Sequence, residues 1–285
     1  EAIGDLEKAL THYRDVMKAG VRPTEARANF ARINASLENR EMTLEDATLE
    51  LERLRFSWRG DDFEFELLRR LGDLYLDIGD FRKSLSVHRL AVTYFPDLPD
   101  TKVVSEEMNG VFKRLFLDGE ADAMSAISAL ALFYDFRELT PLGNDGDEMI
   151  RQLATRLVSV DLLDRAAQLL QHQVEFRLKS VKRAQVGLRL AVIHMLNRKF
   201  EKALSTMKVT RWRNLPGPLE AERKQVEARI LANLKKPEDA LLALVGDQTD
   251  EAHLIRTDLY WQMRRWGDVA ESLNDILQDA WRGPR

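Results

Sequence analysis

The chain has 285 residues, a formal net charge of −4 at pH 7 and no cysteine, which excludes disulfides, zinc–thiolate sites and thiol nucleophiles. Glycine (14) and proline (8) are scarce, so few positions interrupt helices and we expect an all-helical chain. No run approaches the roughly 18 apolar residues of a membrane helix, and we expect no part of this sequence to insert into a membrane.

The first predicted element is a helix that begins at the start of the chain. Apolar residues recur there at helical spacing, at Ile3, Leu6, Leu10, Tyr13 and Met17. Because the chain starts at Glu1 and within this pattern, we expect it to be a piece of a longer protein. The compartment stays open, since the absence of cysteine fits the cytoplasm and the periplasm equally.

Residues 64–97 contain the most informative pattern of the chain. It reads Leu68-x2-Leu71-Gly72-x2-Tyr75, followed by Ser84, His88, Ala91 and Pro96. This segment resembles a tetratricopeptide repeat, a helix–turn–helix unit with a bulky residue, Leu-Gly and Tyr on its first helix and small residues on its second. The segment departs from that family at Leu68, where the family favours tryptophan, and at His88, where it favours a large apolar residue.

Physical reasons for several of these residue types are visible in the sequence. Gly72 allows a neighbouring helix to approach closely, and Gly79-Asp80 predicts the turn between the two helices. Pro96 ends the second helix, because proline has no N–H and its ring clashes with the preceding turn. Arg59-Gly60-Asp61 is predicted to join this hairpin to the one before, with Gly60 in the turn and Asp61 capping the next helix.

The small residue of the second helix recurs along the chain, and at five of its seven positions it follows an apolar or proline residue and two charged residues. The positions are Ala47, Ser84, Ala123, Ala166, Ala203, Ala240 and Ala270. We therefore predict an all-α, right-handed solenoid of about seven tetratricopeptide-like hairpins. Several spacings are 37 residues, longer than the roughly 34 of the family, so a related family with longer repeats remains open outside residues 64–97.

Two connections rich in turn-forming residues interrupt the helical pattern. Residues 134–148 include Gly143-Asn144-Asp145-Gly146-Asp147, and residues 212–219 include Pro216-Gly217-Pro218. We expect one continuous solenoid made of residues 1–136 and 147–285, with a joint at residues 137–146. In the alternative interpretation, both connections are solvent loops without a role.

The sequence offers no motif for catalysis or for a cofactor. Neither G-x-G-x-x-G nor G-x-x-x-x-G-K-[ST] occurs, so nucleotide chemistry is not expected. The five histidines lie far apart, and none has the spacing that places two imidazoles on one helix face for a metal. We expect no enzyme activity, no cofactor and no metal.

Charge is distributed unevenly along the chain. Residues 1–174 hold 22 basic and 32 acidic residues and residues 237–285 hold 5 and 10, whereas residues 175–236 hold 16 basic and 5 acidic residues. A basic block of this kind favours docking of an acidic protein segment, although a solvated face balanced by the acidic flanks explains it as well. Nucleic acid is not expected, because the whole chain is acidic and has no recognised nucleic-acid-binding motif.

The resemblance implies a non-enzymatic scaffold that binds a peptide or helix of a partner along a concave surface of first helices. Two stripes are candidates for that surface: Asn29, Arg32, Ser36 and Asn39, and Glu66, Arg69, Asp73 and Asp77. In the basic block the candidates are Arg189, Arg198, Arg223 and Arg229. A hydrated surface explains these positions equally, and two other functions remain open: a regulatory or assembly domain of an enzyme complex, or an enzyme with a scattered site.

Overall fold

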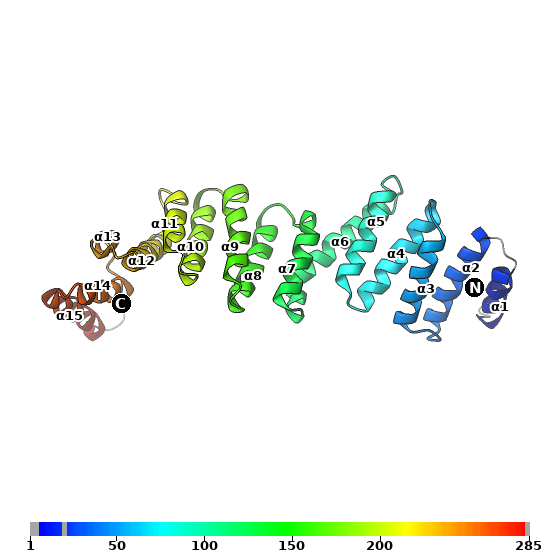
Figure 1. Cartoon of the computed structure of the whole chain (residues 1–285), viewed down its shortest axis with the longest axis horizontal. Coiled ribbons are helices and arrows are strands. Elements are labelled where there is room, and N and C mark those ends of the chain that lie inside the picture. Colours follow the sequence, from blue (N-terminus) through cyan, green and yellow to red (C-terminus); the bar gives the residue numbers. More distant parts are fainter. Residues whose placement is uncertain (1–5, 19–21, 283–285) are drawn as a thin grey trace. The chain divides into compact units, whose positions relative to one another are not determined.

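The computed structural model describes residues 6–18 and 22–282, and every regular element in these ranges is a helix, as the sequence predicts. The chain divides into two compact units, Glu1–Pro141 and Leu142–Arg285. Within each unit the helices follow one another in chain order (Figure 1). No helix in the described ranges has the length and apolar character needed to cross a membrane.

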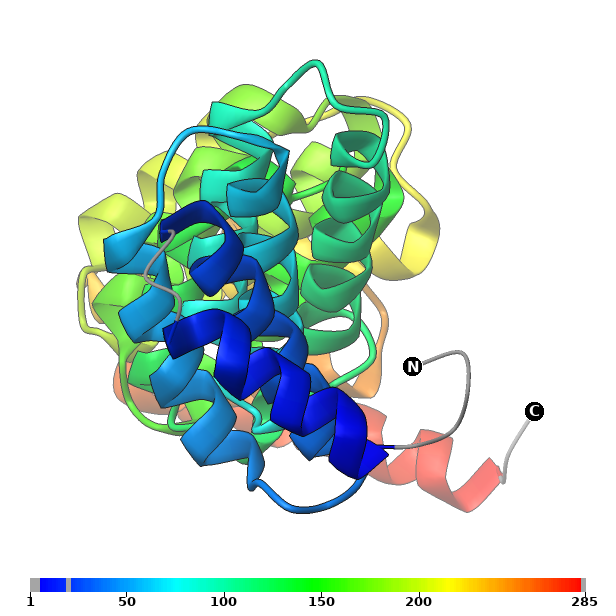
Figure 2. The same cartoon turned by 90° about the vertical axis from the view of Figure 1, so that its right-hand side faces the viewer.

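The first unit begins with α1, α2 and α3, which lie side by side (Figure 2). Its elements are α1 (Leu6–Lys18), α2 (Arg22–Glu38), α3 (Leu44–Ser57), α4 (Asp62–Asp77), α5 (Phe81–Tyr94), α6 (Thr101–Phe116), the 3-10 helix η1 (Glu120–Ala123), α7 (Ala126–Asp135) and the 3-10 helix η2 (Arg137–Leu139). After α1, the helices pair as the hairpins α2–α3, α4–α5 and α6–α7.

The second unit consists of the hairpins α8–α9, α10–α11, α12–α13 and α14–α15. Its elements are α8 (Asn144–Ser159), α9 (Leu163–His172), the π-helical turn η3 (Gln173–Arg177), α10 (Ser180–Leu196), α11 (Phe200–Val209), α12 (Gly217–Asn233), α13 (Pro237–Ala243), α14 (Asp250–Gln262) and α15 (Trp266–Arg282). The described ranges therefore contain the seven hairpins that the sequence predicts. We call the helices of each pair the first and the second helix.

Every hairpin turn has one residue in the left-handed conformation, with φ between 55° and 91°. These residues are Arg40, Gly79, Gly119, Asp161, Arg198, Lys235 and Arg264. In all but the α6–α7 turn, the N–H of the following residue bonds to the carbonyl five residues before it, as from Asp80 to Tyr75 and from Lys199 to His194. This is the bond of a Schellman motif, which satisfies a free carbonyl of the first helix and reverses the chain.

Replacing Arg40 by glycine is expected to raise the free energy of unfolding by about 0.5–1 kcal/mol. A left-handed φ costs a residue with a Cβ about 1–2 kcal/mol, and the greater chain entropy of glycine cancels part of the gain. Gly79→Arg is the matched control: its Cβ meets no atom within 4 Å, so it loses stability through φ alone. Urea unfolding measures the free energy of unfolding of both variants. A change in the same direction for both would show that the conformation of the turn residue does not determine the stability of these hairpins.

The fourth residue of each second helix is buried against the first helix. Six of these residues are small and fully buried or nearly so, and the seventh is valine: Ala47, Ser84, Ala129, Ala166, Ala203, Ala240 and Val269. Five of the predicted positions are confirmed, whereas Ala123 and Ala270 are wrong and both are exposed. Close helix crossing explains the preference for small side chains here.

The two errors have separate physical causes. In the α6–α7 hairpin, Gly119 is followed by η1, so the second helix begins only after Ser125, whose hydroxyl accepts the N–H of Ser128 as its N-cap. Ala123 therefore lies in η1 and Ala129 takes its place. In the last hairpin the second helix begins one residue earlier than the spacing suggests, which puts Val269 instead of Ala270 against the first helix.

Several local predictions for the hairpin α4–α5 are confirmed. Gly60 has φ of 101°, and the Asp61 carboxylate caps α4 by accepting the N–H groups of Phe63 and Glu64. Gly79 has φ of 79° in the turn, Asp80 caps α5, and α5 ends two residues before Pro96. The sequence therefore specifies both ends of this hairpin.

One turn prediction is wrong. Asn144-Asp145-Gly146 was expected in the joint before the next helix, but α8 already begins at Asn144, after Gly143 with φ of 88°. The acidic side chains of Asp145 and Asp147 lie in the first helical turn, where the positive end of the helix dipole favours them. Only the segment before Asn144 departs from helix.

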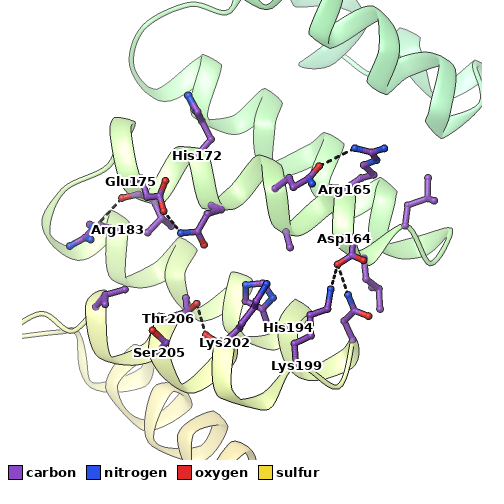
Figure 3. A pocket seen from close by; sticks show the side chains of 18 of the residues that line it. Asp164, Arg165, His172, Glu175, Arg183, His194, Lys199, Lys202, Ser205 and Thr206 are labelled. Carbon is purple, nitrogen blue, oxygen red and sulfur yellow. Dashed lines mark hydrogen bonds and ion pairs between the residues drawn. The ribbon is translucent and has the colours of Figure 1, made fainter.

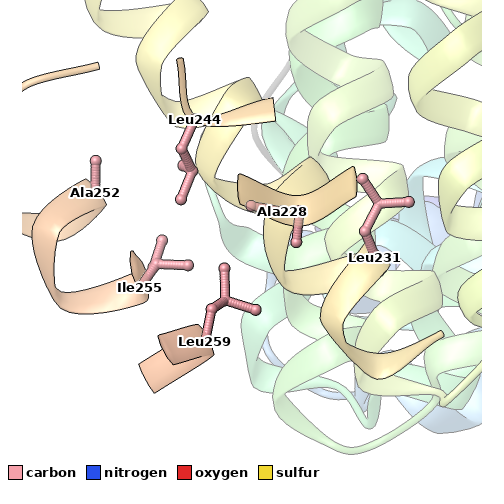
Figure 4. Close-up of a cluster of buried hydrophobic side chains, with 7 residues drawn as sticks. Ala228, Leu231, Leu244, Ala252, Ile255 and Leu259 are labelled. Atoms are coloured by element: carbon pink, nitrogen blue, oxygen red, sulfur yellow. The ribbon is translucent and has the colours of Figure 1, made fainter. Parts of the chain in front are cut away.

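Stacking of successive hairpins creates the core of the second unit. One cluster joins Ala228 and Leu231 of α12, Ala240 of α13, Leu244 after it, and Ala252, Ile255 and Leu259 of α14 (Figure 4). Another joins α10 and α11 to Val226 and Ile230 of α12. Each cluster contains one complete hairpin and the first helix of the next, so no hairpin buries its apolar face alone.

Candidate functional site

The first helices of the second unit border two hollows that meet at one residue. The smaller, of about 420 Å³, lies among α8, α10 and α12 and is mostly apolar, with Ala154, Val158, Leu188, Val192 and Leu196 in its lining. The larger, of about 1200 Å³, lies among the end of α10, α12 and α14. Leu196 lines both hollows, and we call the two hollows together the first-helix groove.

The apolar part of the first-helix groove is open to solvent. Leu196 is 54% exposed, and Leu254 in the larger hollow is 51% exposed. Charged side chains of both signs surround them: Arg151, Arg189, Arg198, Glu222, Arg229, Lys235, Glu251 and Asp258. An apolar floor with a charged rim matches the anatomy of protein-binding surfaces.

Three of the four arginines predicted in the basic block line this groove. Arg189 lies beside the smaller hollow, and Arg198 and Arg229 line the larger one. All three are exposed, but Arg229 forms an ion pair with Glu251 of the next first helix. Arg198 is also the left-handed residue of its hairpin turn.

Arg223 was predicted as a docking residue, and the structure contradicts this. Only 6% of Arg223 is exposed, and its guanidinium donates to the carbonyls of Ala184 at 2.6 Å and Met207 at 2.8 Å and to Thr210 Oγ1 at 3.3 Å. Burial lowers the pKa of this guanidinium below its usual value, while Glu227 opposes the shift. Arg223 thus joins α12 to α10 and to the end of α11, and it presents no charge to a partner.

The predicted stripe on α2 is largely occupied by internal contacts. Arg32 bonds to Asn29 within α2 and forms an ion pair with Glu50 of α3. Ser36 is buried, so its prediction as a groove contact is wrong. Asn39 is exposed but lies beyond the end of α2, where its side-chain amide donates to the Ala35 carbonyl at 2.8 Å.

The predicted stripe on α4 divides into two paired and two exposed residues. Arg69 lies 3.5 Å from Asp100 and 3.3 Å from Glu107, and so connects α4 to α6 and to the residue before it. The carboxylate of Asp73 lies 3.3 Å from Nε2 of His88, which is buried. Glu66 and Asp77 are exposed and remain candidates for contact with a partner.

A third hollow, of about 1340 Å³, was not predicted from the sequence. It lies between the second helices α9 and α11, with α10 beneath, and we call it the second-helix groove (Figure 3). Asp164 and Lys199 lie toward one end, Lys202 and His194 near the middle, and Glu175 and Arg183 toward the other end. In the sequence, the helical spacing of Lys199, Lys202, Ser205 and Val209 indicates that these residues share one face of a helix. This spacing could have predicted one wall of the groove.

Electrostatics differ along the second-helix groove. Asp164 bonds to Lys199, and accepts the side-chain N–H of Asn197 at 2.8 Å, so its pKa lies below the usual value. Burial, then the charges of Lys202 and Lys199, lower the pKa of His194. The imidazole is therefore neutral at pH 7. In the described ranges, no three His, Asp or Glu side chains gather as a metal would require.

Repeated hairpins with a left-handed turn and a small buried residue at one position make this a helical-repeat protein of tetratricopeptide-like fold. No protein-family model and no curated protein matches the sequence. Among solved structures, the chain is similar to a tetratricopeptide repeat protein from Parabacteroides merdae, at 12% identity over 89% of this chain and 92% of that one, with a TM-score of 0.37.

It is also similar to a chain of the Naa15/Naa10 complex bound to HypK-THB, at 13% identity over 89% of this chain and 38% of that one, with a TM-score of 0.40. For the tetratricopeptide domain of P58(IPK), the identity is 12% over 96% of this chain and 93% of that one, with a TM-score of 0.29. These values describe likeness of fold, and the repeat class rests on the hairpin geometry of the chain itself.

Proposed function

We propose that this chain is a non-enzymatic scaffold that binds an amphipathic segment of a partner protein along the first-helix groove. The observation that carries the proposal is the exposed Leu196, which lies on the apolar floor of both hollows and is bordered by charges of both signs. Bound apolar side chains would cover that floor, and charged side chains of the segment would meet the rim.

The geometry of the groove supports an extended ligand instead of a small molecule. The two hollows together span α8, α10, α12 and α14, so a partner contacts four repeats of the second unit. Small-molecule sites usually enclose most of the ligand in a single concave pocket, whereas both hollows here are open. Affinity would then come from many modest contacts with a preformed surface.

Rim charges select the partner more than they strengthen its binding. Within the described part of the chain, Arg189 and Arg198 have no ion-pair partner and can meet acidic side chains, whereas Arg229 is already paired with Glu251. Exposed pairs of this kind contribute about 0–1 kcal/mol each, so the apolar contacts at the floor carry most of the binding free energy.

Leu196→Glu is expected to abolish partner binding while leaving the fold intact, because the side chain is half exposed and its replacement places a charge on the apolar floor. Affinity purification from native extract with quantitative mass spectrometry would compare this variant with the unchanged chain. The matched control is Leu242→Glu on α13, whose side chain is 68% exposed and lines neither hollow.

Partners that bind the unchanged chain and the Leu242 variant, but not the Leu196 variant, would support the proposal. If all partners bind the Leu196 variant equally well, the first-helix groove is not the binding surface. Saturable thermal stabilisation of the chain by a small molecule would favour an enzyme or a ligand-regulated domain instead.

A further inference from the structure

The second-helix groove has walls of different charge. On α11 and the residue before it, the lining consists of Lys199, Lys202, Ser205, Thr206 and Val209, so both charged residues there are basic. On α9 and the adjoining residues, the lining includes Asp161, Asp164, Arg165, Gln168, Gln171, His172 and Glu175. Arg183, His194 and Asn197 of α10 and its end complete it.

Most charges of this groove have partners within the chain. Lys199 is paired with Asp164, the Nε of Arg183 donates to the carbonyl of Val174 at 3.0 Å, and Glu175 accepts from Gln171. The ammonium of Lys202, by contrast, has no hydrogen-bond or ion-pair partner among the residues that the structure describes, whereas its backbone carbonyl accepts from Thr206 Oγ1. Its ammonium is exposed near the middle of the groove (Figure 3).

His194 lies beside this free cation and is itself incompletely satisfied. Its Nδ1 is buried and has no hydrogen-bond partner in the described part of the chain. The charged groups that line the groove around it are Asp161, Asp164, Arg165 and Glu175 with His172 on the α9 side, Arg183 on α10, and Lys199 and Lys202 on the α11 side. Burial is the largest cause that lowers the pKa of His194, the charges of Lys202 and Lys199 add to it, and Asp164 opposes it.

We propose that the second-helix groove is a second docking surface, which binds an acidic segment of a partner protein with one carboxylate beside Lys202 and His194. A carboxylate there neutralises the free ammonium and favours the imidazolium form of the half-buried His194. The segment is a separate ligand from that of the first-helix groove, because the two surfaces use different residues of α10.

Charge along the groove favours protein over nucleic acid. A nucleic acid carries a charge at every phosphate, and its backbone would pass the carboxylates of Asp161, Asp164 and Glu175 as well as Lys202. A protein segment can place an acidic side chain at Lys202 and neutral or basic side chains beside these carboxylates. Its charge pattern therefore fits walls of mixed sign.

The test is an NMR titration of the histidine side chains with two peptide probes, an octapeptide of alternating Glu and Ala and its counterpart of alternating Gln and Ala. The chain has five histidines, so their ring signals are few enough to separate. The Glu probe is expected to raise the pKa of His194, while the Gln probe leaves it unchanged. Binding of the Glu probe should weaken with added salt.

Lys202→Gln is expected to weaken binding of the Glu probe about fivefold, as for loss of one exposed charge pair. Lys208→Gln is the matched control, since Lys208 is exposed on the same helix but does not line the groove. Leu196→Glu should leave binding of this probe unchanged, which separates the result from that of the first-helix groove.

Three outcomes would overturn the proposal. The Glu probe fails to bind at millimolar concentration, the Lys202 and Lys208 substitutions weaken its binding equally, or the probe changes the pKa of other histidines and not that of His194. Tighter binding of an oligothymidylate than of the Glu probe, with the same dependence on Lys202, would also overturn it and assign the groove to nucleic acid.

Discussion

Replacing Gly72 by leucine is expected to destabilise the α4–α5 hairpin by about 3 kcal/mol, the upper part of the usual range for overpacked cores. A Cβ at this position would lie 2.2 Å from Nε2 of His88, closer than non-bonded atoms approach. The imidazole has little room to move, because it is buried and its Nε2 lies 3.2 Å from the Arg69 carbonyl and 3.3 Å from the Asp73 carboxylate.

Hydrogen exchange of α4 and α5 is the suitable measurement, because repeats contact mainly their neighbours and the chain need not unfold in one step. The control is Gly110→Leu in α6, where a Cβ meets no atom within 4 Å. Leucine is a better helix former than glycine, so this variant should gain up to about 1 kcal/mol.

A double substitution distinguishes a clash with His88 from a general loss of packing. If the imidazole is the obstacle, adding His88→Ala to Gly72→Leu should cost less than the two separate effects combined. Two results would show that the close approach of Gly72 and His88 does not limit stability. One is strict additivity of the two free-energy changes, and the other is hydrogen exchange in Gly72→Leu equal to that of the unchanged hairpin.

The hairpin at residues 64–97 was predictable because local chemistry alone determines its main features. Gly60, Asp61, Gly79 and Asp80 each act within a few residues of the chain, by adopting positive φ or by capping a helix. The close approach at Gly72 follows from the absence of a Cβ. Only the identity of the side chain that approaches Gly72, which is His88 on the facing helix α5, required the structure.

The register of the other repeats was less predictable, because a regular spacing does not reveal how long a turn is. The left-handed residue and the small buried residue are five positions apart in most hairpins, but ten apart from Gly119 to Ala129. The intervening 3-10 helix leaves little trace in the sequence. Ser125 and Ser128 are a recognisable capping signal that would have corrected the register.

The candidate sites were predictable only in part, since a count of charges does not say which side chains are exposed. Arg189, Arg198 and Arg229 do line the first-helix groove, but Arg223 has the same charge and is buried. Helical periodicity contained the missing information. Arg223 is three and seven residues before Val226 and Ile230, so it lies on the buried face of α12.

Replacing Arg223 by methionine is expected to lower the free energy of unfolding by about 3 kcal/mol, although methionine fills much of the same volume. The guanidinium satisfies the Met207 carbonyl in the last turn of α11, where helix carbonyls lack partners within the helix. It also bonds to the Ala184 carbonyl and to Thr210, and charged hydrogen bonds contribute about 1.5–3 kcal/mol each. The negative end of the α11 dipole stabilises the buried cation further.

Urea unfolding, with hydrogen exchange of α10, α11 and α12, measures the effect, and Arg229→Met is the matched control. Arg229 is exposed on the same helix with one ion pair, so its loss should cost at most about 1 kcal/mol. Equal stability of the two variants would show that Arg223 does not hold these helices together. If Arg223→Met is much less stable than Arg229→Met, a loss of partner binding in Arg223→Glu would be explained by damage to the packing of α10, α11 and α12. It would not indicate a lost docking contact.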